Sequence, residues 1–299
     1  MKNLIVKNYK VITFFTVIIL IFTSIYYYFF NVYQPENMLG KDIRLFRNTP
    51  IWNLAKAVDN EDTNKIYIFV KDKGIPIDFQ EPKFGQTLLI WATYCGRERA
   101  VEALLKLGAD PNLQDHYNGD NAILIASDAS LYSNDWCSPN LLRIILKYGG
   151  DPNTKSFLKF NDKGGVYGAE SPLTKASRVC LEKVKLLVDA GANINYVSKE
   201  GFQNPLVSSL SMKKPDIVKY LLIEKGANYR NAENLVTIYG DTITVSSYLR
   251  TWDFPLDSEE YKIKMEIVQY LKEQGEDYWS CPIPKKIREN YPQEYLTKY

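Results

Sequence analysis

One pattern of apolar residues returns from residue 50 onward, and it constrains the fold more than any other feature of the chain. Its clearest copy is FGQTLLIWATYCGRERAVEALLKLGADPNLQD, residues Phe84–Asp115. In this copy Leu89 and Ala92 share one face of a short first helix, while Val101 and Leu104 share one face of a second. Such a helix pair cannot bury its own apolar face, so it must stack on neighbouring copies.

Further copies follow the same order of short helix, second helix and turn. In the clearest copy Gly108 has the left-handed freedom that ends a helix, and Asp110-Pro111 begins a turn to the next copy. The other copies are Gly119–Asn153, Ser171–Asn195, Asn204–Asn228 and a degenerate Thr242–Asp277, preceded by Ile51–Asp78 as an N-terminal capping unit. About six units exceed the three that a stable stack needs.

The Phe84–Asp115 copy resembles the ankyrin repeat, in which G-x-T-P-L-H-x-A-A is followed by a glycine and a helix ending in L-L-x-x-G-A-D-x-N. The landmarks present are Gly85, Thr87, Leu89, Ala92, Gly96, Leu104, Leu105, Gly108, Ala109, Asp110 and Asn112. Leu88 and Ile90 stand where the family has Pro and His, which removes an inter-repeat hydrogen bond but not the fold. The resemblance covers roughly 230 residues. It implies an all-α ankyrin-repeat solenoid over residues 50–277, followed by a C-terminal tail, 278–299.

Three insertions interrupt the units, near residues 128–137, 154–170 and 251–260. Insertions in stacked repeats become surface loops, often on the binding face. The first contains Tyr132 and Trp136, and the last contains Trp252 and Phe254. Each loop has two interpretations: it contacts a partner, or it folds back over a poorly packed stack. For the last insertion, covering the C-terminal end is favoured.

The N-terminal region predicts a membrane anchor. Val11–Phe30 contains no charged residue and as a helix would be about 30 Å long, which matches a bilayer core. Lys2, Lys7 and Lys10 precede it, and no basic residue follows it until Lys41. No A-x-A-like pair follows the apolar run, so an uncleaved anchor is favoured over a cleaved signal peptide. We expect a cytoplasmic head (1–10), a transmembrane signal-anchor (11–30), a polar linker (31–49) and periplasmic repeats, in a single-pass inner-membrane protein.

The charge of the chain argues against nucleic-acid binding. The formal net charge is +2, from 37 basic and 35 acidic residues, and three of the lysines precede the apolar segment. The rest is nearly neutral, whereas neutralising phosphates needs a basic surface.

No motif predicts catalysis, a metal site or a cofactor. The only histidine, His116, follows Asp115 in a turn between units, with no nucleophile turn near it. No C-x-x-C spacing occurs, which disfavours a zinc site. The recurring Asp110 and Asp151 occupy the same repeat position and are interpreted as structural. We therefore expect a binding protein and not an enzyme.

Four cysteines are present, and three of them recur near the turns between the two helices of successive units: Cys95, Cys137 and Cys180. Aligned positions in stacked helices lie about 10 Å apart, too far for a disulfide. Cys137 ends an insertion, however, and could therefore lean onto a neighbouring unit. A disulfide of Cys137 with either Cys95 or Cys180 is a hypothesis of the sequence.

The family resemblance implies that a protein partner docks on turn tips and first helices. The 22 tyrosines fit either an AT-rich genome or an interface, and their positions favour the interface. For Trp91, packing against the neighbouring first helix is an equal alternative. The predicted partner-binding residues are Trp91, Tyr94, His116, Tyr117, Asp120, Tyr132, Trp136, Tyr196, Phe202, Tyr229 and Arg230.

The layout is similar to membrane-anchored ankyrin-repeat immunity proteins of bacteria, which neutralise toxins such as secreted phospholipases delivered by neighbouring cells. No Asn lies in an N-x-Ser/Thr sequon, which disfavours a eukaryotic secreted protein. The second hypothesis is a membrane-anchored scaffold for envelope protein complexes. The third is a cytoplasmic or host-directed binder.

Overall fold

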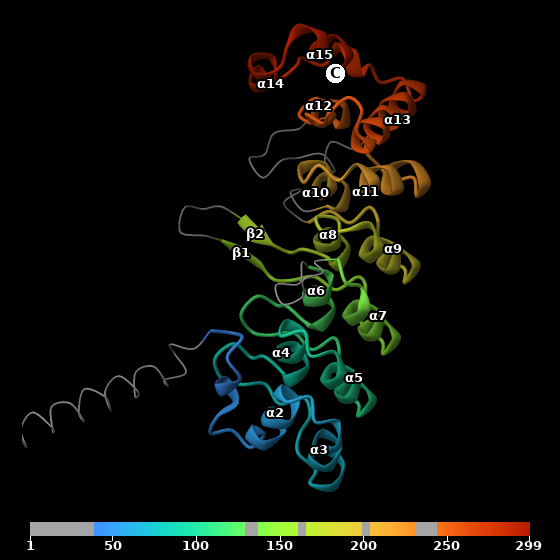
Figure 1. Cartoon of the computed structure of the whole chain (residues 1–299). Helices are drawn as coiled ribbons and strands as arrows, with labels where there is room; N and C mark the ends of the chain where they lie inside the picture. The colour runs from blue at the N-terminus through green and yellow to red at the C-terminus, as the bar shows by residue number, and fades with distance from the viewer. Residues whose placement is uncertain (1–38, 129–136, 161–165, 199–203, 231–243) are drawn as a thin grey trace, which may run out of the picture.

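The fold is a stack of helix pairs in chain order (Figure 1). The computed structural model describes residues 39–128, 137–160, 166–198, 204–230 and 244–299. Six helix pairs lie within these residues, as the repeats predicted. They are α2 (Trp52–Asp59) with α3 (Thr63–Tyr67) and η3 (Ile68–Asp72), α4 (Leu88–Tyr94) with α5 (Glu98–Lys106), α6 (Ala122–Ser127) with α7 (Asn140–Lys147), α8 (Pro172–Ala176) with α9 (Leu181–Asp189), α10 (Pro205–Ser211) with α11 (Pro215–Lys219) and η4 (Tyr220–Glu224), and α12 (Val245–Leu249) with α13 (Glu259–Glu273). We number these pairs units 1 to 6.

The first helices of units 2 to 6 begin at the same repeat position because each has a side chain that caps it. Each capping oxygen accepts a hydrogen bond from the backbone N–H three residues later, which satisfies a donor that the helix leaves unpaired. The caps are Thr87, Asn121, Ser171, Asn204 and Thr244. A helix of five to seven residues is marginal by itself, so its stability comes from packing.

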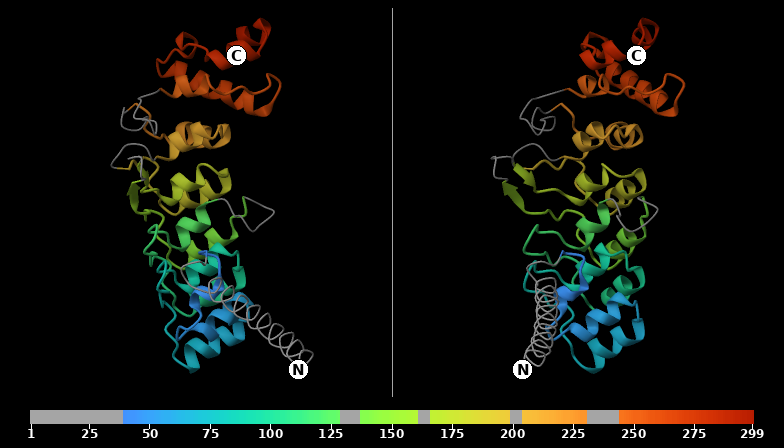
Figure 2. Two further views of the ribbon diagram at one scale, coloured as in Figure 1. Left: turned by 90° about the vertical axis from the view of Figure 1, so that its left-hand side faces the viewer. Right: turned by 60° about the vertical axis from the view of Figure 1, so that its left-hand side comes forward.

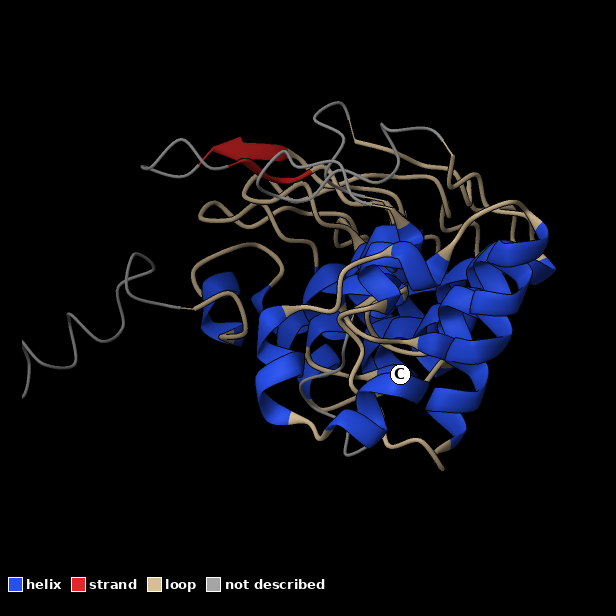
Figure 3. Cartoon of the chain, turned by 90° about the horizontal axis from the view of Figure 1, so that it is seen from above, coloured by secondary structure: helices blue, strands red, loops and turns tan. Residues whose placement is uncertain are grey.

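Helices form two layers, and the turns between units project from one side of them (Figures 2 and 3). The predicted apolar positions of the clearest copy are buried between units, including Leu89, Ala92 and Leu104. One continuous core runs from Leu45 to Ala227, and a second fills the C-terminal units around Trp252. The apolar stripes of neighbouring units therefore complete one another.

An asparagine ladder joins the turns of successive units. The Asn112 amide donates to the carbonyl of Gly149 (2.9 Å) and accepts from the Asp151 N–H (2.8 Å). One unit further on, Asn153 donates to Gly191 (3.0 Å) and accepts from the Asn193 N–H (2.8 Å). Each side chain thus bonds twice to the next unit, and the repeated G-x-D-P-N ending encodes the ladder. The Asp residues of that ending are structural, as expected, because each accepts the N–H of its own Asn.

A β-hairpin corrects the all-α expectation. Strands β1 (Leu158–Phe160) and β2 (Val166–Gly168) pair antiparallel, with Leu158 opposite Gly168. The hairpin lies in the insertion between units 3 and 4 and projects on the side of the turns (Figures 1 and 3). A long turn between antiparallel chain segments gains backbone hydrogen bonds when it forms a hairpin. The helical periodicity of the sequence does not indicate such a hairpin.

The segment before unit 1 corrects the predicted linker. Residues up to 49 were expected to form a spacer, but a 3-10 turn, η2 (Ile43–Phe46), buries Leu45 and Phe46 completely or nearly so. The side chain of Asp42 caps this turn at the Arg44 N–H (2.9 Å). We call Gly40–Phe46 the N-terminal strap. Two apolar side chains in a polar stretch were enough to attach it to the core.

The C-terminal tail folds over the last unit. It contains η6 (Tyr278–Ser280), α14 (Lys285–Asn290) and α15 (Gln293–Lys298), which lie at the end of the stack in Figure 1. The insertion before α13 takes the covering role: Trp252 is fully buried, and its indole N–H donates to the carbonyl of Leu210 in unit 5 (2.9 Å).

A disulfide joins units 3 and 4. Cys137 pairs with Cys180, with Cα atoms 5.7 Å apart, which confirms one of the two pairings that the sequence left open. Cys95 and Cys281 are free. The predicted anchor, 11–30, lies outside the described residues. Within the ranges that are described, no helix combines the length and apolar character that crossing a membrane requires.

We predict that Asn153→Ala lowers the free energy of unfolding by about 1–3 kcal/mol, because two inter-unit hydrogen bonds are lost. Asn153→Asp should lose less, because a carboxylate still accepts the Asn193 N–H but cannot donate to Gly191. Urea unfolding followed by circular dichroism measures both. Asn64→Ala, on the exposed surface of α3, is the control and should not destabilise the protein. Equal losses for Asn64→Ala and Asn153→Ala would contradict the ladder's role.

We also predict that reducing Cys137–Cys180 destabilises the stack by about 2–4 kcal/mol, because the bond closes a long loop across two units. The unfolding midpoint should fall when a reductant is added to the wild type and should already be low in Cys137→Ser. In Cys281→Ser the full effect of the reductant should remain. A midpoint in the wild type that does not respond to reductant would refute the stabilising role.

Candidate binding surface

The turns between units are rigid because buried acids organise their backbones. The Asp115 carboxylate oxygen Oδ1 accepts from the backbone N–H groups of Asn118 (2.7 Å) and Gly119 (2.9 Å). Burial raises the pKa of Asp115, although these donors act to lower it. One unit earlier, Glu81 binds the N–H of Phe84 in the same way (2.8 Å). We call these turns between units fingers; they lie around residues 81–86, 115–120, 154–157 and 193–196.

Neighbouring fingers are also bonded to each other. The His116 N–H donates to the carbonyl of Phe84 (2.8 Å), and the Phe157 N–H donates to that of Asn118 (2.7 Å). The His116 ring lies against Gly85, where an added Cβ would stand 2.4 Å from it. The Phe157 ring covers Gly119 in the same manner, with 2.5 Å to such a Cβ. Only glycine allows this stacking of rings on the preceding finger, so His116 has a packing role.

Aromatic side chains are exposed along these fingers. Tyr117 is 58% exposed and Phe157 is 44% exposed. The half-buried Phe84 packs edge-to-face against Tyr117, with ring centroids 5.6 Å apart. Tyr196, on a later finger, is half-buried, and its hydroxyl donates to the carbonyl of Ala169 at the base of the hairpin. We call Phe84, Tyr117, Phe157 and Tyr196 the finger row. Phe84 and Phe157 were missed by the sequence analysis, although Phe157 follows a recurring turn by a fixed spacing.

Trp91 and Tyr94 face the chain's own N-terminal strap. Trp91 is 2% exposed, and its indole N–H donates to the carbonyl of Lys41 (3.1 Å). The Lys41 ammonium lies 4.8 Å from the centre of the Tyr94 ring. Trp91 is therefore a packing residue, as the alternative to partner binding predicted, but the segment shown to cover it is the strap and not the neighbouring first helix that the sequence suggested.

Asp120 belongs to a partly buried ion network at the centre of the stack. Lys175 on α8 pairs with Asp120 (3.3 Å) and Asp128 (3.7 Å). Burial acts to lower the pKa of Lys175, but Asp120, Asp128 and Glu170 outweigh it and hold the pKa above its ordinary value. Beside it, Arg178 pairs with Glu170. Asp120 therefore holds units 3 and 4 together.

Tyr229 and Arg230 also have structural contacts. Tyr229 is 6% exposed and lies in the second core, which contradicts its assignment to the surface. Arg230 is exposed, and its guanidinium donates to the carbonyl of Gln274 in the next unit (2.8 Å). It occupies the ladder position in place of asparagine. The remaining predicted residues, Tyr132, Trp136 and Phe202, lie outside the described residues.

The insertion that carries Tyr132 and Trp136 is fixed to unit 4 at both of its described ends. At the start, the Lys183 ammonium donates to the carbonyl of Asp128 (2.6 Å), and Lys175 contacts its carboxylate. At the end, Cys137 is bonded to Cys180. The sequence offered this disulfide as one of two possible pairings of Cys137, but it did not indicate the buried lysine.

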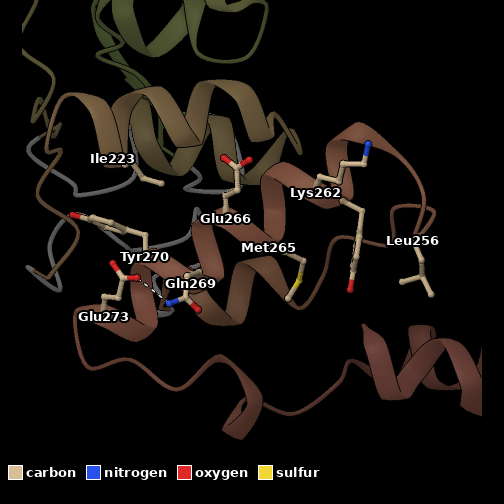
Figure 4. A pocket seen from close by; sticks show the side chains of 9 residues that line it. Ile223, Leu256, Lys262, Met265, Glu266, Gln269, Tyr270 and Glu273 are labelled. Carbon is tan, nitrogen blue, oxygen red and sulfur yellow. Dashed lines mark hydrogen bonds between the residues drawn. The ribbon is translucent and has the colours of Figure 1, made fainter.

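A groove of about 670 Å³ lies beside α13 (Figure 4). Ile223 reaches it from η4, and Leu256 reaches it from the insertion before α13 (Figure 4). Glu266 in its wall is paired with Lys219 (2.5 Å), and Gln269 donates to Glu273 (2.9 Å). These neutral and paired groups offer contacts, but no activated nucleophile or acid.

Chemistry beyond binding finds little support in the described part of the chain. No group of His, Cys, Asp or Glu side chains there is arranged to hold a metal ion. Burial raises the pKa of the Cys95 thiol to about 11, which disfavours the reactive thiolate. The surface is suited to recognising another molecule by shape and apolar contact.

Comparisons with known proteins agree with this geometry. The family described as "Ankyrin repeats (3 copies)" matches residues 54–156. A putative ankyrin repeat protein of Acanthamoeba polyphaga mimivirus is 28% identical over 143 residues, which are 46% of this chain and 85% of that protein. Another from the same virus is 32% identical over 134 residues, which are 39% of this chain and 22% of the longer relative.

The matched region spans units 1 to 3, and helix pairs of the same form continue the stack to Glu273. The caps and the asparagine ladder continue with them. Residues 54–156 therefore contain ankyrin repeats, and the units that follow them have the same helix-pair form.

Proposed function

We propose that this chain binds a protein partner along the finger row. The carrying observation is that Tyr117 and Phe157 are large, exposed and held on neighbouring rigid fingers. Exposed aromatic side chains on a rigid backbone lose little entropy on binding and are common hot spots of interfaces. Ankyrin repeats indicate a protein-binding role, and the finger row supplies its strongest contacts here.

Tyr117→Ser is expected to weaken partner binding by about 30-fold or more, which corresponds to the roughly 2 kcal/mol of a hot spot. The partner would first be captured with the full chain and identified by mass spectrometry, and its affinity then measured by biolayer interferometry. Tyr67→Ser is the matched control, because Tyr67 is 54% exposed but lies on α3, the second helix of unit 1. Unchanged affinity of Tyr117→Ser, with an unchanged melting temperature, would move the interface away from the fingers.

We further propose that the stack lies in the periplasm, tethered by residues 11–30. The charge-free segment and the lysines before it support this orientation. The Cys137–Cys180 disulfide adds support, because disulfides persist in oxidising compartments. In spheroplasts, added protease should digest the repeats. Digestion only after lysis would favour the cytoplasmic alternative.

The partner that this layout favours is a toxin, such as a phospholipase, that reaches the periplasm from neighbouring cells. A stack held at the membrane surface would intercept it there, and blocking its active site requires only tight binding. Cells lacking the protein should die beside toxin-armed siblings and survive when it is restored. A constitutive complex with envelope proteins, together with unimpaired survival, would instead favour the scaffold alternative.

A further inference from the structure

Two cationic side chains lie buried in one aromatic cluster beneath the C-terminal residues. Lys264 is 0% exposed and Arg250 is 3% exposed. The rings around them belong to Tyr278, Trp279 and Tyr299. We propose that residues 281–299 form a pH-sensitive latch on the last ankyrin unit, and that protonation of Lys264 loosens it.

Arg250 attaches the end of the latch to unit 6. Its guanidinium donates to the carbonyls of Tyr278 and Trp279, each at 3.3 Å, and to that of Tyr299. The Tyr299 hydroxyl donates in return to the carbonyl of Arg250. The ring of Tyr299 also stacks on Tyr295, with centroids 5.3 Å apart. Tyr299 is therefore bound to Arg250 through both its backbone and its side chain.

Lys264 lies directly under the ring of Tyr299. Its ammonium nitrogen is 3.7 Å from the centre of the Tyr299 ring and 3.0 Å from the Trp252 carbonyl, to which it donates. In the described part of the chain, no ion pair joins Lys264 to a carboxylate, and the nearby Asp253 is paired with Lys213. The other groups facing it are Arg250 from α12, Tyr278 from η6 and Tyr261 from its own helix. The rings favour the ammonium through cation–π contact, but burial beside Arg250 without a carboxylate partner disfavours it more.

The direction of the pH effect follows from this arrangement. Burial, aided by Arg250, lowers the pKa of Lys264 to about 7 from an ordinary value of 10.5. When the latch opens, water restores the ordinary pKa, so the open form binds the proton more tightly. Opening should therefore increase about tenfold for each unit by which the pH falls between those two values. Below pH about 7 both forms hold the proton, and the dependence should end.

Amide hydrogen exchange of the full chain, followed between pH 6 and pH 9 and corrected for intrinsic rates, tests the latch. In the wild type, opening of residues 285–299 should increase about 50-fold from pH 9 to pH 7 and level off at about 100-fold below pH 7. In Lys264→Met, which keeps an unbranched side chain only one atom shorter and without charge, opening should not depend on pH. Lys262→Met, on the exposed side of α13, should behave as the wild type does.

A wild-type profile without this slope would overturn the latch, and so would a slope that persists in Lys264→Met. If Lys264→Met does not fold, the side-chain titration of Lys264 in the wild type, followed by NMR, replaces it. A midpoint near 7 there, together with the slope, supports the proposal, and a midpoint near 10 refutes it.

Discussion

The stack depends on polar side chains that bond across the boundary between units. Apolar burial alone would let helix pairs slide, because it is non-directional. The amides of Asn112 and Asn153 each bond twice to the next unit, and so they fix the spacing and register of the turns. With the turns held in register, the fingers stack, and their side chains reach fixed positions. The surface that can recognise a partner is a consequence of that ladder.

The chain covers its own surfaces at both ends of the stack. At the N-terminal end, the strap buries Trp91 on the first-helix face of unit 2. At the C-terminal end, the tail buries Lys264 and Arg250 against the last unit. Between them, the ion network of Lys175 occupies the first-helix face of unit 4. Much of the first-helix surface is therefore occupied internally, whereas the fingers keep large aromatic side chains exposed.

Sequence predicted the features that repeat. The number of units, the apolar faces and the turns could be predicted because each recurs with a fixed period. Cys137 stood out because it ends an insertion that interrupts that period. Features that occur once could not be read. Nothing in the pattern shows that Leu45 and Phe46 of a polar segment return to the core, or that Lys264 differs in burial from Lys262, two residues before it. Trp91 and Tyr229 were placed on the surface from their repeat positions, but Trp91 is covered by the strap and Tyr229 lies in the second core.

The distribution of these irregular features has a functional meaning. Repeat positions maintain the stack, so substitutions there lower stability without changing what the surface recognises. The insertions and end segments are outside that constraint, and they determine which parts of a generic stack remain accessible. In this chain the disulfide and the buried Lys183 fix both described ends of one insertion to unit 4. Fixing a loop before the partner arrives lowers the entropy lost on binding. Specificity for one partner is therefore expected to reside in these single features and in the finger row, and affinity in how rigidly the ladder holds them.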